Sequence, residues 1–119
     1  MSRTEVLDQI NSAIGPVVIR LVDLKNEIAI LGERLAGALQ PNVAEYQAAL
    51  GERQREYNAL ETQLRELRKQ LIAAYERDLN IMEMEKQNTL DAFTIEELGW
   101  LQQQVRTKID QLKKLVDEN

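Results

Sequence analysis

The sequence contains neither cysteine nor histidine. This absence excludes disulfides, thiol nucleophiles, imidazole acid–base catalysis and zinc sites of the usual Cys/His type. The sequence also lacks a glycine-rich nucleotide loop, a nucleophile elbow and a metal-binding motif. We therefore expect a protein that is not an enzyme, with no catalytic, cofactor-binding or metal-binding residues and no cofactor.

Aromatic residues and prolines are scarce. Aromatics make up 4% of the 119 residues, and there are only two prolines. Hydrophobic residues nevertheless reach 44%, which is enough for a folded chain. Leu, Ala, Glu, Gln and Arg dominate, as is typical of long helices and coiled coils. The composition predicts an all-α fold, and the length predicts a single helical domain spanning residues 1–119.

Long apolar runs and excess positive charge are missing as well. No apolar run approaches the roughly 20 residues of a membrane-spanning helix. The net charge of −5 argues against nucleic-acid binding, which depends on neutralising phosphates. The N-terminal residues 1–5 lead directly into a charged amphipathic segment without a signal peptide. We expect a soluble, cytoplasmic protein that binds neither membrane nor nucleic acid.

Three segments have the spacing of a helix-starting capping box, in which a short polar residue precedes a glutamate by three positions. They are Ser2–Glu5, Asn42–Glu45 and Thr94–Glu97. Turn-forming residues also occur at Pro41-Asn42 and between Asn88 and Asp91. Because strand-like alternation never persists, we predict three helices over roughly residues 3–39, 43–88 and 95–117.

The first two helices carry matching heptad patterns that predict a coiled coil. The first pattern comprises Leu7, Ile10, Ile14, Val17, Leu21, Leu24, Ile28, Leu31, Leu35 and Ala38. The second comprises Val43, Tyr46, Leu50, Arg53, Tyr57, Leu60, Leu64, Leu67, Leu71 and Ala74. The connection at 40–42 is short, so the helices should form an antiparallel hairpin in which these two seams meet.

The third predicted helix should pack back on the second. Its apolar stripe consists of Leu98, Leu101, Val105, Ile109, Leu112 and Val116. It is long enough to cover the second helix only from about residue 64 onward, where the start of the first helix also lies. We therefore predict an all-α fold with a three-helix bundle at the base and a projecting hairpin over residues 19–62.

Two features depart from the regular pattern of the first two helices. Gly15-Pro16 falls within the first helix, where proline lacks the amide that would bond to Ser12 and crowds that carbonyl. The apolar phase continues across it, which favours a kink or brief interruption that could act as a hinge. Arg53 is the polar residue on the second seam, where it could fix the register or extend its side chain to solvent.

Several apolar residues lie off the predicted seams and are candidate interface contacts. They are Ile19, Val22, Ile30, Ile81, Met84 and Trp100. Self-association is the simpler explanation, because closed homo-oligomers are the commonest use of such surfaces. A partner protein is the alternative, and Trp100 could instead cover the adjacent loop.

The segment 83–97 is acidic, with five carboxylates against one lysine. It could bind a cation or dock a basic partner. The simpler explanation is that carboxylates favour a helix N-terminus and solvate a loop.

These features predict a non-enzymatic coiled-coil protein for protein–protein interaction and assembly. We expect a homodimer or higher homo-oligomer that serves as a structural or adaptor component, for example in a phage, secretion or cytoskeletal assembly. One alternative is a regulator or inhibitor that docks its helical hairpin on a larger enzyme. A second alternative is a small helical chaperone.

Overall fold

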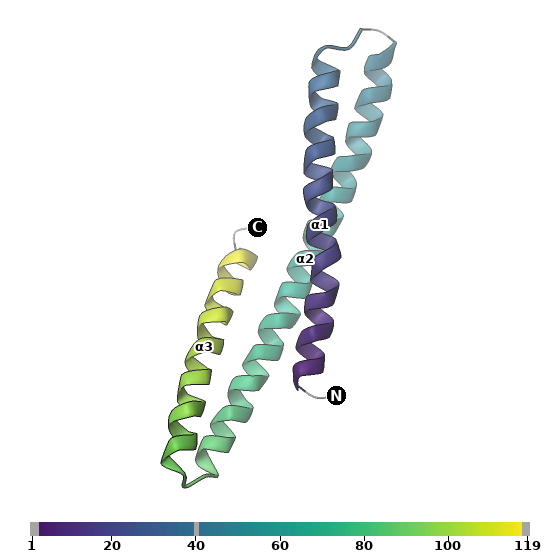
Figure 1. Ribbon diagram of the computed structural model, residues 1–119. Helices are drawn as coiled ribbons and strands as arrows, with labels where there is room; N and C mark the ends of the chain where they lie inside the picture. The colour runs from purple at the N-terminus through teal and green to yellow at the C-terminus, as the bar shows by residue number, and fades with distance from the viewer. Residues whose placement is uncertain (1–2, 40, 118–119) are drawn as a thin grey trace. The chain divides into compact units, whose positions relative to one another are not determined.

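The structure is a computed structural model that describes residues 3–39 and 41–117. It contains three long helices, α1 (Arg3–Ala36), α2 (Asn42–Gln87) and α3 (Ala92–Asp117), with no strand in the described part of the chain (Figure 1). The helix α2 contacts both α1 and α3. The predicted all-α fold, in which the third helix packs back on the second, is confirmed.

Two predicted helix ends are wrong by three residues, because local hydrogen bonds rather than apolar periodicity determine them. The helix α1 ends at Ala36, where Ala38 N bonds to Leu35 O (3.2 Å) and tightens the last turn. At the start of α2, Asn42 was expected to precede the helix and is instead its first residue. Such one-residue differences are common at helix ends.

The helix α3 begins at Ala92, not at residue 95, because Asp91 is its N-cap. The backbone amide of Phe93 donates to Asp91 Oδ1 (3.2 Å), and the Thr94 hydroxyl donates to Asp91 Oδ2 (2.6 Å). These hydrogen bonds lower the pKa of Asp91, since they favour its charged form. Thr94 therefore lies inside the helix, and the capping box predicted at Thr94–Glu97 is wrong. The one predicted at Ser2 lies outside the described residues.

Gly15-Pro16 does not break α1, which continues through both residues. Pro16 is exposed while its neighbour Val17 is buried, so the proline ring occupies the solvent side of the helix. Whether the pair acts as a hinge stays a prediction.

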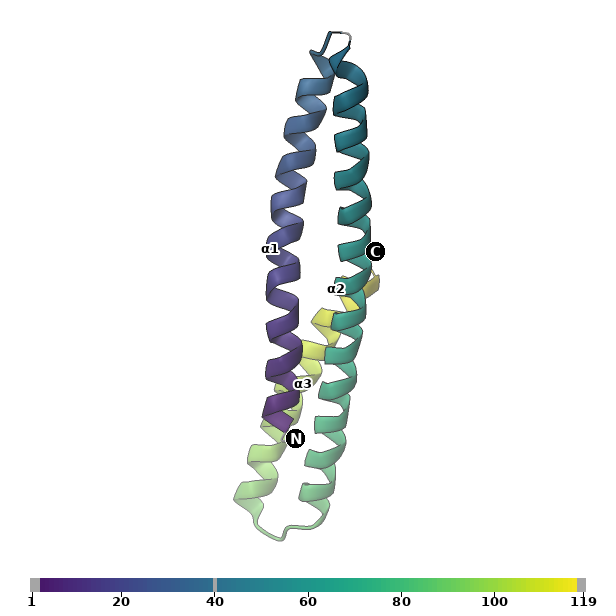
Figure 2. The ribbon, with the colours of Figure 1, turned by 90° about the vertical axis from the view of Figure 1, so that its right-hand side faces the viewer.

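Residues 12–65 form one compact unit, the hairpin unit, from most of α1 and the first half of α2. Within it the two helices lie side by side in opposite directions (Figures 1 and 2). Leu24 is completely buried (0% exposed), and Val17 and Leu64 are also buried. The other predicted seam residues of the unit are half-buried, as expected where only two helices cover a seam.

Residues 3–11 and 66–117 belong to a second compact unit, the C-terminal unit. In its core, Ile72 of α2 packs with Ile109 and Val116 of α3. Half-buried residues from both helices complete this cluster: Tyr75, Leu79, Val105 and Leu112. One predicted core residue of α3 is wrong, since Leu101 is exposed and Gln102 is buried in its place.

Candidate interaction surfaces

A bidentate ion pair joins the two helices of the hairpin unit. Arg20 on α1 donates from Nε and Nη2 to the two carboxylate oxygens of Glu56 on α2, at 2.8 and 2.9 Å. Its Nη1 also donates to Glu27 Oε2 at 3.3 Å. The hydrogen bond with Glu56 raises the pKa of Arg20 and lowers that of Glu56. Both side chains are partly exposed, so the pair contributes orientation and register more than stability.

This ion pair was not predicted from the sequence. The signal that could have found it is the pattern of opposite charges flanking a coiled-coil seam, which sets partner choice and orientation. Arg20, Glu27 and Arg34 repeat every seven residues along α1, so they follow one flank of the seam.

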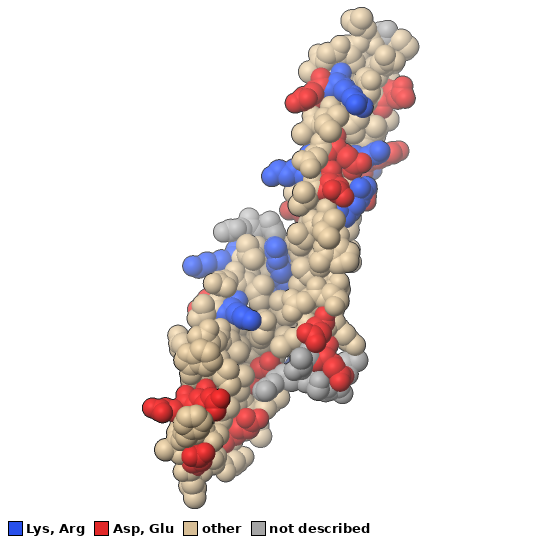
Figure 3. All heavy atoms as spheres, viewed as in Figure 1, with Lys and Arg blue, Asp and Glu red and all other residues tan. Residues whose placement is uncertain are grey.

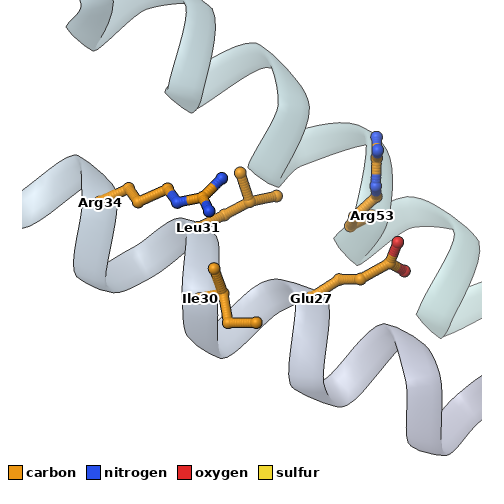
Figure 4. A pocket seen from close by; sticks show the side chains of 5 residues that line it. All are labelled: Glu27, Ile30, Leu31, Arg34 and Arg53. Atoms are coloured by element: carbon orange, nitrogen blue, oxygen red, sulfur yellow. The ribbon is translucent and has the colours of Figure 1, made fainter.

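Arg53 lies beside a shallow hollow of about 260 Å³ in the hairpin unit. Figure 4 shows Arg34 extending along α1 toward Leu31, while Glu27 and Arg53 come from the two facing helices. The Arg53 Nη1 atom lies 3.6 Å from Glu52 Oε2 on its own helix. The guanidinium thus reaches a carboxylate at the surface although Arg53 occupies a seam position, which is the behaviour of an extended, partly exposed side chain. Its role in fixing register stays a prediction.

Three of the predicted contact residues lie together on the outer side of α1. Ile19, Val22 and Ile30 are 65%, 55% and 47% exposed. At about 100° per residue, they lie on the side of the helix opposite the seam. Ile30 also lines the hollow beside Arg53, so this outer face extends to the flank of the hairpin. We call Ile19, Val22 and Ile30 the outer face of α1.

In the C-terminal unit, a buried amide links α2 and α3. Gln102 is 2% exposed and donates from Nε2 to Glu83 Oε2 at 2.9 Å. Its Oε1 accepts from Lys86 Nζ at 3.1 Å, and Lys86 Nζ also lies 3.8 Å from Glu83 Oε2. The amide hydrogen bond is the main cause of the lowered pKa of Glu83, followed by the charge of Lys86. All polar atoms of the Gln102 amide group are therefore engaged across the helix pair.

The structure brings Ile81 and Met84 together in one groove near the turn between α2 and α3. This groove measures about 530 Å³ and has Leu98 of α3 as a further apolar contact. Its polar lining comprises Glu85, Asn88, Thr89 and Thr94.

Trp100 does not join that groove. It lies with Phe93, Glu96 and Glu97 around a separate shallow hollow of about 400 Å³ on α3. Trp100 was predicted as an interface contact, but its grouping with Phe93, Glu96 and Glu97 was not. The signal was available, because residues 93 and 100 are seven apart and share one helix face.

In the described part of the chain, no cluster of three or more acidic residues could hold a metal ion. None of the helices in residues 3–39 and 41–117 combines the length and the apolar character that a membrane-spanning segment needs. Comparison with protein families, curated proteins and solved structures gives no match, so a functional assignment depends on the surfaces described above.

Proposed function

We propose that this protein is a non-enzymatic coiled-coil assembly protein that forms a homodimer or higher homo-oligomer through the outer face of α1. The observation that carries the proposal is the exposure of Ile19, Val22 and Ile30 on a helix whose seam is already occupied by α2. Burying such side chains is favourable by about 25 cal/mol per Å² of apolar surface removed from water. A second copy offers the same apolar face, and symmetric pairing of one face with itself is the commonest form of assembly.

The charges along α1 favour an ordered contact over indiscriminate aggregation. Arg20 lies on the flank of the hairpin and is already paired with both Glu27 and Glu56. Between the apolar residues of the outer face lie Asp23 and Asn26, which interrupt the apolar surface. Polar groups buried in a contact must find hydrogen-bond partners there, which favours one specific arrangement of the two copies.

The test is the molar mass in solution, measured by sedimentation equilibrium or light scattering at micromolar concentration. We expect a dimer or larger species for the unmodified chain and a monomer of unchanged helicity for Ile19→Glu/Val22→Glu, because the added carboxylates would be desolvated in the contact. Gln47→Glu/Asn58→Glu is the matched control, since it adds the same charge at exposed positions of α2. This control should leave the mass unchanged.

A monomeric unmodified chain would refute the assembly proposal. It would instead support the alternative of a regulator that docks its helical hairpin on another protein. Loss of helicity in Ile19→Glu/Val22→Glu would show that these residues stabilise the folded chain rather than an interface.

A further inference from the structure

We propose that the Phe93–Trp100 face of α3 docks a basic segment of another protein, with an arginine side chain lying between the two aromatic rings. This inference goes beyond the proposed assembly, because it concerns a different unit and requires no self-association.

The aromatic residues of this face are unusually exposed. Phe93 is 71% and Trp100 63% exposed, although aromatics are the largest apolar side chains of a chain that has few of them. They are seven residues apart, so they point to the same side of α3, separated by about 10 Å at 1.5 Å per residue. The buried residues Leu98 and Gln102 lie on the opposite side, against α2. The face is therefore not part of the fold's own core.

Two carboxylates lie between Phe93 and Trp100 in the sequence of α3. Glu96 and Glu97 line the same hollow as Phe93 and Trp100. Among residues 3–39 and 41–117, no lysine or arginine forms an ion pair with either of them. The only cation of the segment 83–97, Lys86, is engaged with Glu83 and Gln102. The negative charge of this face therefore remains available to a partner.

The preference of carboxylates for a helix N-terminus does not account for Glu96 and Glu97. The first turn of α3, which begins at Ala92, contains no acidic residue. The helix dipole acts mainly within the first turn, so its effect on residues 96 and 97 is small. In Figure 3, acidic side chains gather toward the α2–α3 turn, whereas basic ones lie over the C-terminal half of α3.

The combination of rings and carboxylates determines the chemistry of the occupant. A cation over an aromatic face is attracted by the ring, and tryptophan is the best such ring. The planar guanidinium of arginine can stack on an aromatic side chain while its N–H groups donate to carboxylates. A purely apolar partner would desolvate Glu96 and Glu97 without compensation, and a nucleic acid would be repelled. The C-terminal unit already contains one cation–π contact, in which Lys108 Nζ lies 5.7 Å from the centre of the Tyr75 ring.

Trp100 is the only tryptophan of the chain, so its fluorescence reports directly on this face. The probe is a hexa-arginine peptide, with hexa-lysine and an uncharged hexapeptide for comparison. We expect a saturable change in Trp100 emission with hexa-arginine, a weaker one with hexa-lysine and none with the uncharged peptide. In Glu96→Gln/Glu97→Gln the apparent affinity should fall roughly tenfold, which corresponds to about 1.4 kcal/mol.

The matched control is Glu33→Gln/Glu45→Gln, which changes the net charge equally at exposed positions of the hairpin unit. It should bind hexa-arginine within about twofold of the unmodified chain, because neither residue lines the hollow beside Phe93 and Trp100. Equal losses in both double variants would show that only net charge matters, and the proposal would be wrong. Circular dichroism verifies that each variant remains helical.

A dilution series without peptide tests the alternative that this face binds a second copy of the chain. If Trp100 emission changed with protein concentration alone and did not respond to hexa-arginine, the face would be a self-association surface and the proposal would be refuted. Failure of the outer face of α1 to mediate assembly would leave this outcome unaffected, because the two tests use different residues and readouts.

Discussion

At the scale of single residues, two substitutions of Gln102 test whether its hydrogen bonds or the filling of its buried position stabilise the contact between α2 and α3. We expect Gln102→Ala to destabilise the protein by about 2 kcal/mol, since it leaves a cavity and removes two hydrogen bonds. Gln102→Leu should be neutral or stabilising, because leucine fills the space while Glu83 and Lys86 are partly exposed and can pair with each other. Urea unfolding measures both effects. A large loss of stability in Gln102→Leu would show that the amide hydrogen bonds themselves hold α2 and α3 together.

The same contact has a pH dependence. The pKa of Glu83 is lowered in the folded protein, chiefly by the Gln102 hydrogen bond. Because this pKa is lowered on folding, the contact stabilises the protein at pH values above the ordinary carboxyl pKa. This stabilisation is lost as the pH falls through the folded-state pKa. In Gln102→Leu the pKa of Glu83 should return toward its ordinary value, as NMR titration would show.

Residue type alone could not have identified Gln102. The sequence pattern favoured Leu101 for the core because leucine is apolar, yet the heptad spacing from Leu98 to Val105 passes through residue 102. Helix geometry decided which side chain points inward, and hydrogen-bond partners on α2 then made burial of an amide acceptable. The partners Glu83 and Lys86 lie on α2. Their proximity to Gln102 therefore depends on the register between α2 and α3, which the apolar periodicity of one helix does not specify.

At the scale of helices, α1 offers a direct measure of the cost of Gly15-Pro16. We expect Pro16→Ala to stabilise the protein by about 1–3 kcal/mol, because it restores an amide donor and removes the ring's clash in a helix interior. Gly15→Ala should add about 1 kcal/mol, since a Cβ there meets no atom within 4 Å. Urea unfolding measures both gains, with Ala13→Gly as an inverse control that should lose about as much as Gly15→Ala gains. No gain in Pro16→Ala would mean that α1 already accommodates the proline without loss.

The helices and their seams were predictable because they depend on repeated apolar spacing over many residues. Leu24 and Leu64 are buried where the two heptad patterns predict contact between α1 and α2. The helix ends were less predictable, because a single hydrogen-bonding group decides each one. Asp91 competes with Thr94 as N-cap, and both residue types suit that position. Helical spacing could assign interface residues to one face of a single helix, but it could not predict that Leu98 of α3 joins Ile81 and Met84 of α2 in one groove.

At the scale of the whole chain, the two proposed surfaces should respond differently to salt. Raising the salt concentration from about 0.1 to 1 M shortens the Debye length from about 10 to about 3 Å. Assembly through Ile19, Val22 and Ile30 depends on apolar burial, so the solution mass should be unchanged or increase. Docking of hexa-arginine depends partly on Glu96 and Glu97, so its affinity should fall over the same range. Sedimentation and Trp100 fluorescence measured on the same samples would follow both processes. A mass that decreased with salt would show that charges, not the apolar outer face of α1, hold the assembly together.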